Sequence, residues 1–195
     1  MKLSTLTAIL TLVVAAGGCG EGGGRRGNET ARAQPPADSS RSGGGVRGIP
    51  AAELEAAAGD VVAFLRGAGP FERVRLADTV TLYVSPEGGG ARAVFDRERL
   101  RSSSSWIVRS ERQRYAFAPP VGLTKLTTRV GRHFDCLEYP LSSRFPALAP
   151  LPHVGVKLEP DSGGNCLQSW NVTLVFDSVA RPPRLVAAVY DQWEW

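Results

Sequence analysis

Residues 20–49 carry almost no side chain that a protein core could use. This stretch, GEGGGRRGNETARAQPPADSSRSGGGVRGI, has no aromatic residue, and its only large aliphatic side chains are Val46 and Ile49. Such a segment cannot bury enough apolar surface to offset the entropy it would lose on ordering. We therefore expect a disordered tether here, with a mean span of roughly 30 Å from ~5–6 Å times the square root of its length. The folded part of the chain is then confined to a single domain, residues 50–195.

The residues before the tether are typical of an export signal. Lys2 precedes an uncharged run whose apolar core covers residues 6–16. About 11 residues would span roughly 17 Å as a helix, which is too short for the ~30 Å hydrocarbon layer of a membrane. A positive start, a short apolar core and small residues after it predict a secretory signal peptide over residues 1–18.

The stretch Ala16-Gly17-Gly18-Cys19 resembles a bacterial lipobox. The resemblance implies that Cys19 is joined through a thioether to diacylglycerol, becomes the first residue after cleavage and carries fatty acids such as palmitate. Two or more acyl chains hold a protein stably on a bilayer. We therefore expect a lipoprotein anchored in the bacterial cell envelope. Gly20 takes the place of the aspartate that commonly marks retention in the inner membrane, which favours the outer membrane in a bacterium that has two.

The charge balance of the folded part argues against a nucleic-acid partner. Residues 50–195 contain 17 lysines and arginines against 16 acids, so most of the net charge of +4 belongs to residues 1–49. A nucleic-acid footprint needs a basic face on the domain itself. We expect none, and we expect the bilayer, an envelope protein or a small ligand as partners.

Periodicity predicts one helix followed by strands. The spacing of Leu54, Ala57, Val61 and Leu65 predicts an amphipathic helix over residues 51–69, with Gly59 as its weak point. Strict alternation marks a half-buried strand within residues 71–85. Further strands are predicted at residues 91–95, 105–109, 114–118, 167–177 and 183–195.

These elements predict an α+β domain with an N-terminal helix packed on a mostly antiparallel β-sheet, because no alternation of strands with helices is present. The order of elements is similar to that of cystatin-like and NTF2-like folds. The last two strands should form a hairpin, with Leu185, Val189 and Trp193 sharing one face. Residues 121–153 are predicted to be irregular, because four prolines interrupt their second half.

Two cysteines remain once Cys19 is assigned to lipid. Cys136 and Cys166 can pair in only one way, and an oxidising compartment favours the bond. A disulfide closing a loop of about 30 residues would stabilise the fold by roughly 3–4 kcal/mol. We predict this disulfide.

One cluster could carry chemistry. In RHFDCLEYP, His133 and Cys136 lie three residues apart, and His153 follows downstream. These residues could serve an envelope hydrolase with a cysteine nucleophile, or join Cys166 in a tetrahedral metal site. A disulfide would remove the thiolates that both readings need. The leading prediction is therefore a tethered protein without catalytic residues, metal or cofactor, which binds a small ligand or an envelope protein. The hydrolase or metal protein is the alternative.

Overall fold

The structure, a computed structural model, describes the chain in four stretches: residues 48–86, 90–134, 139–163 and 165–191. The predicted signal peptide, Cys19 and nearly all of the tether lie outside these stretches, and so does Cys136. The predictions made about them stay predictions. No helix within the four stretches is long and apolar enough to span a bilayer.

Helix α1, Ala51–Leu65, forms where the sequence predicts a helix. Its buried face carries Leu54, Val61 and Leu65, as the spacing predicts. Ala58 is buried with them, and Ala57 is partly buried against the same core. The helix continues through Gly59, since burial of this face stabilises it more than one glycine weakens it. It stops four residues before the predicted end.

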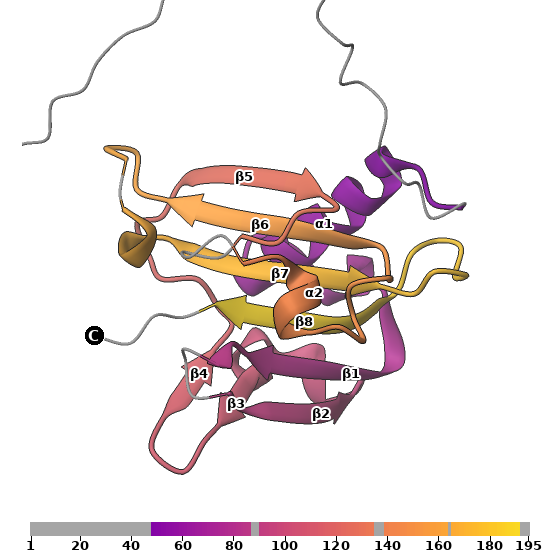
Figure 1. Ribbon diagram of the computed structural model, residues 1–195, viewed down its shortest axis with the longest axis horizontal. Coiled ribbons are helices and arrows are strands. Elements are labelled where there is room, and N and C mark those ends of the chain that lie inside the picture. The colour runs from indigo at the N-terminus through magenta and orange to yellow at the C-terminus, as the bar shows by residue number, and fades with distance from the viewer. Residues whose placement is uncertain (1–47, 87–89, 135–138, 164, 192–195) are drawn as a thin grey trace, which may run out of the picture. The chain divides into compact units, whose positions relative to one another are not determined.

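Six strands form one mixed sheet in the order β2-β1-β8-β7-β6-β5 (Figure 1). Their bounds are β1 Leu76–Val84, β2 Arg92–Asp96, β5 Lys125–Val130, β6 His153–Glu159, β7 Trp170–Phe176 and β8 Leu185–Asp191. Every neighbouring pair is antiparallel except β1 and β8, which run parallel. A separate hairpin is formed by β3 (Ile107–Arg109) and β4 (Arg114–Ala116). The molecule is thus an α+β domain with a mostly antiparallel sheet, as predicted.

The two faces of the sheet follow from side-chain alternation. In β1, Val80, Leu82 and Val84 are buried in the core, as their period of two predicts. In β8 the predicted shared face is wrong for Leu185 and Val189, and Trp193 lies outside the described residues. Leu185 joins the core, but Val189 lies opposite Thr173 on the other face. The reason is an irregularity in the β7–β8 ladder just after Leu185, because one extra residue reverses the face of every residue beyond it.

Residues 121–153 are more regular than the sequence predicts. They contain β5 and the start of β6, and the short helix α2, Leu141–Arg144, follows Pro140. β5 escapes recognition because it is a polar edge strand, in which no residue is fully buried. The prolines act as expected only in the second half, where α2 is four residues long.

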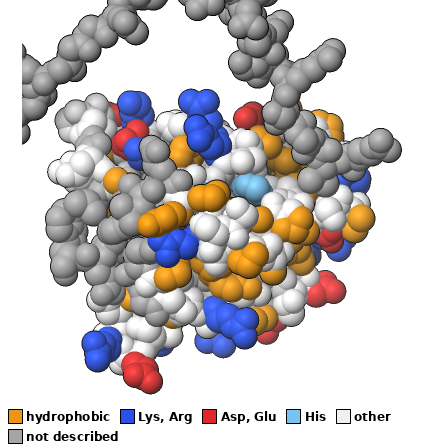
Figure 2. All heavy atoms as spheres, in the orientation of Figure 1, with side chains coloured by type: hydrophobic (Ala, Val, Ile, Leu, Met, Phe, Trp, Pro, Cys, Tyr) orange, Lys and Arg blue, Asp and Glu red, His pale blue; other side chains and the backbone are white. Residues whose placement is uncertain are grey.

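Both faces of the sheet are covered. On one face lie α1 and the β3–β4 hairpin. The ring centre of Trp106, the residue before β3, lies 6.2 Å from that of Phe64 in α1. On the other face, α2 lies in front of β7 and β8 (Figure 1). Apolar side chains gather in the middle of this second face, with basic and acidic ones around them (Figure 2). All seven residues of β7 are buried as a result.

Candidate functional site

Three polar side chains meet under the segment that leads from β5 to β6. Nδ1 of His133 lies 2.7 Å from Oγ1 of Thr173, and Nε2 of His133 lies 3.5 Å from Oδ2 of Asp191. Only 2% of the His133 side chain and 3% of the Asp191 side chain are exposed, and Thr173 is fully buried. We call these three residues the His133 cluster.

The sheet register builds this cluster. Thr173 points away from the α1 face of β7, and Asp191 of β8 lies opposite Asn171, two residues from Thr173 on the same face. The chain after β5 brings His133 over them by crossing β6 at Gly155. A Cβ atom at Gly155 would stand 2.5 Å from the backbone oxygen of Arg132. Glycine is therefore required at this crossing.

The order Thr173–His133–Asp191 is that of a nucleophile, a base and an acid that orients the base. Such a set is catalytic only when a substrate can reach the nucleophile. Thr173 is 0% exposed, and the other two side chains are almost as deeply buried. The geometry therefore supports a structural role, in which the buried side chains of His133, Thr173 and Asp191 contact one another beneath the 131–134 segment.

Cys166 is disulfide-bonded, which agrees with one half of the predicted pair. Its Sγ also accepts a weak hydrogen bond from Nδ2 of Asn171 at 3.7 Å. Cys136 lies outside the described residues, so the pairing of the two stays a prediction. A sulfur in a disulfide is neither a nucleophile nor a metal ligand. Cys166 therefore does not supply the fourth ligand of the alternative metal site.

The imidazole of His153 has a hydrogen-bond partner outside the His133 cluster. Nδ1 of His153 lies 2.8 Å from the backbone oxygen of Leu151. Within the four described stretches, no three side chains of histidine, cysteine, aspartate or glutamate gather in a way that could hold a metal ion. The described geometry thus gives no support to the hydrolase or the metal protein.

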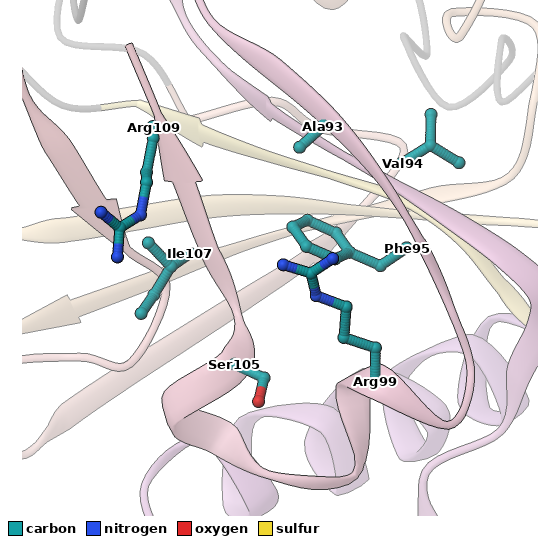
Figure 3. A pocket seen from close by; sticks show the side chains of 7 residues that line it. All are labelled: Ala93, Val94, Phe95, Arg99, Ser105, Ile107 and Arg109. Carbon is teal, nitrogen blue, oxygen red and sulfur yellow. The ribbon is translucent and has the colours of Figure 1, made fainter. Parts of the chain in front are cut away.

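An open pocket of about 370 Å³ lies at the other end of the sheet, beside its edge strand β2 (Figure 3). This volume is within the range of small-ligand sites, which hold roughly 300–1,000 Å³. Its lining residues are Ala93, Val94, Phe95, Arg99, Ser105, Ile107 and Arg109. We call it the arginine pocket.

The local backbone structure positions the side chains of the two arginines in this pocket. Arg99 begins a 3₁₀ turn, Arg99–Arg101, and its backbone N–H donates to Oδ1 of Asp96 at 2.7 Å. The turn directs the side chain back over β2, where its guanidinium carbon lies 4.9 Å from the centre of the Phe95 ring (Figure 3). This is a cation–π contact. Arg109 comes from the end of β3, on the same face of that strand as Ile107.

Neither pocket arginine has a carboxylate partner among the described residues. The acids nearest in sequence have other roles, since Asp96 caps the turn and Glu98 pairs with Arg101 at 2.5 Å. Residues 92–114 hold seven arginines against three acids, a local excess of four positive charges within a domain, residues 50–195, whose net charge is only +1. The pocket therefore combines an apolar wall with two cations that are available to an anion.

A second hollow of about 210 Å³ lies beside α1. Its lining includes Arg73 and Arg75 as well as Glu53 and Asp60, so the charges of its wall sum to zero. Nothing in this hollow selects a ligand by charge, and the arginine pocket is the stronger candidate.

Comparison of the chain with family models, with curated proteins and with solved structures gives no match. The likeness to cystatin-like or NTF2-like folds therefore stays a prediction.

Sequence reasoning missed the arginine pocket. The near-neutral charge of the domain as a whole led to the prediction that it has no basic face. The signal that could have found the pocket is the local density of arginine between the strand at residues 91–95 and the hairpin after it. A count over 20–25 residues would have shown it.

Proposed function

We propose that this chain is a lipid-anchored protein of the bacterial cell envelope, whose folded domain binds an anionic ligand in the arginine pocket and catalyses no reaction. The anchor is proposed from Ala16-Gly17-Gly18-Cys19, and the tether would let the domain move about 30 Å from the membrane. The outer membrane is the proposed site where a bacterium has two.

One observation carries the binding function. Arg99 and Arg109 line an open pocket, and no carboxylate of the described residues pairs with either. A guanidinium forms paired hydrogen bonds with carboxylate and phosphate oxygens. The Phe95 and Ile107 side chains beside them can contact an apolar part of the same ligand. The His133 cluster, by contrast, is closed to any ligand.

The anchor is tested by exchange of one residue. The Cys19→Ser chain should lose incorporation of radiolabelled palmitate and leave the membrane fraction for the soluble one. Retention of Cys19→Ser in the membrane fraction would contradict the anchor.

The binding function is tested by titration with two small anions, glutarate and inorganic phosphate, followed by amide chemical shifts. We expect saturable shifts at the arginine pocket with at least one of them. The double variant Arg99→Gln/Arg109→Gln should weaken binding at least about tenfold. Arg112→Gln is the matched control, because Arg112 lies in the β3–β4 turn and does not line the pocket. Equal losses in both variants would show a general charge effect and refute the site.

A further inference from the structure

The arginine pocket lies between two strand edges that have no strand partner among the described residues. β2 pairs only with β1 in the six-stranded sheet, and β3 pairs only with β4. The pocket takes residues from both, since Val94 belongs to β2 and Ile107 and Arg109 belong to β3.

The hydrogen-bond ladders show which backbone groups face away from the partner strand. On β2, Ala91 accepts from the N–H of Val84, and Arg97 donates to Asp78. Because residues of an antiparallel strand alternate between bonding and not bonding to the partner, Val94 aims its N–H and C=O away from β1. The outward backbone groups of Val94 thus lie at the pocket.

The same alternation applies to β3. The N–H of Phe117 donates to Trp106, and the N–H of Ser110 donates to Gln113. Residues 106 and 110 therefore bond to β4, and Ile107 and Arg109 aim their N–H and C=O away from it. Of these three residues with outward backbone groups, Val94 and Arg109 are exposed and Ile107 is half-buried.

An unpaired edge is a template for another strand, because each outward N–H and C=O can bond to an extended chain. Here the template is beside two cations and an apolar ring. A free small anion would use the guanidinium groups and leave the strand edges to water. An extended peptide with an acidic side chain would use both.

We propose that the arginine pocket binds an extended, acidic segment of a partner protein, which adds as a strand to the edge of β2 and places a carboxylate between Arg99 and Arg109. This inference rests on the proposed binding function and names its ligand class. Charge complementarity selects the acidic segment, since residues 92–114 carry four more arginines than acids. The backbone edges select a peptide over a lipid head group, because a lipid offers no row of N–H and C=O groups.

The test uses the full chain and a synthetic peptide, acetyl-Thr-Val-Glu-Val-Glu-Val-Thr-amide, which alternates acidic and apolar faces. A second peptide carries N-methyl groups on both glutamates and on no other residue, so it keeps the side chains and loses donors along one edge. Vesicles of phosphatidylglycerol and free glutarate complete the set. Binding is measured by titration calorimetry and amide shifts.

Two variants remove one outward donor each from opposite edges of the sheet. Val94→Pro does so at β2, where proline leaves the bonds to β1 in place. Leu126→Pro is the matched control, because β5 is the other edge strand and the bond from Gly131 to His153 places Leu126 in an outward position there. Both side chains are exposed, Val94 at 62% and Leu126 at 44%.

We expect the plain peptide to bind, the N-methyl peptide to bind at least about tenfold more weakly, and Val94→Pro to weaken the plain peptide at least about fivefold. Leu126→Pro should change its affinity less than twofold. If Val94→Pro fails to fold, the comparison of the two peptides decides alone.

Three results would overturn the inference in different ways. If both peptides bind equally well and Arg99→Gln weakens their binding, no strand is added to β2 and the pocket binds only the anionic group. The proposed function would then still stand. Binding of vesicles alone would replace the peptide by a membrane surface. Absence of binding by the peptide, the vesicles and glutarate would remove the proposed function as well.

Discussion

Replacement of Gly155 by alanine tests how tightly the chain crosses over the sheet. Gly155 is buried in the middle of β6, between Arg129 of β5 and Thr173 of β7. The added Cβ would meet the backbone oxygen of Arg132 at 2.5 Å and Cδ2 of Phe134 at 3.0 Å. The nearest atom belongs to the backbone, so relief requires the 131–134 segment to move and not a side chain to rotate.

The size of the effect follows from two opposing contributions. Overpacking of a core typically costs about 1–3 kcal/mol. Replacement of glycine by alanine also lowers the conformational entropy of the unfolded chain, which stabilises the folded state by about 0.4–1 kcal/mol. We expect Gly155→Ala to lower the free energy of unfolding by about 1–2 kcal/mol. In a domain of this size that lowers Tm by roughly 3–8 °C.

Gly59→Ala is the matched control. Gly59 lies within α1, and a Cβ there would have no atom within 4 Å. Alanine should therefore raise stability by up to about 1 kcal/mol through helix propensity. Both variants are measured by thermal unfolding and by urea titration under non-reducing conditions. If Gly155→Ala matches or exceeds the wild-type stability, the 131–134 segment does not press on β6, and the burial of His133 loses its structural basis.

Substitutions at three further positions test the fold. Thr173→Val removes the hydroxyl that is hydrogen-bonded to His133, so it should lower the free energy of unfolding in urea by about 1–3 kcal/mol. Thr173→Ser keeps the hydroxyl and should retain most of the wild-type stability. Equal losses of stability in the two variants would show that side-chain packing, and not the hydrogen bond, causes the effect. Cys166→Ser removes the disulfide and should lower the free energy of unfolding by about 2–4 kcal/mol. The reduced wild-type protein should unfold at the same urea midpoint as this variant. If Cys166→Ser is as stable as the oxidised wild type, the disulfide does not stabilise the fold. Burial raises the pKa of Tyr190 above its ordinary 10.0, so its contribution to stability is present below pH 10.0 and is lost as the pH rises through the folded pKa. In the Tyr190→Phe variant, Tm should therefore decrease less as the pH rises above 10.0 than it does in the wild type. An unchanged decrease of Tm would show that other groups cause it.

Local sequence patterns predicted those helices and strands in which burial follows a regular period along the chain. The strand β1 shows its buried face in Val80, Leu82 and Val84, because only one of its faces is in the core. β6 was missed. Gly155 and Lys157 interrupt its apolar run, and the reason for the glycine is the crossing of a segment more than twenty residues earlier in the chain. No local pattern contains that information.

The sites were less predictable than the fold class. His133 was a candidate because of its neighbours in sequence, but its partners, Thr173 and Asp191, come from strands 40 and 58 positions away in the numbering. Their burial depends on the covering segment. The arginine pocket needs two strand edges that only the sheet order leaves open. A ladder irregularity of one residue in β8 was likewise invisible in its sequence.

The place of β8 has a consequence for how the protein matures. The last described strand is not an edge: it lies between β1 and β7 and joins the strands from the start of the domain to those from its end. A chain emerging from a ribosome or threading a pore from its amino end cannot close this sheet until residues 185–191 are free. Until almost the whole domain has been translated or translocated, β1 therefore lacks its partner β8 and stays accessible to chaperones.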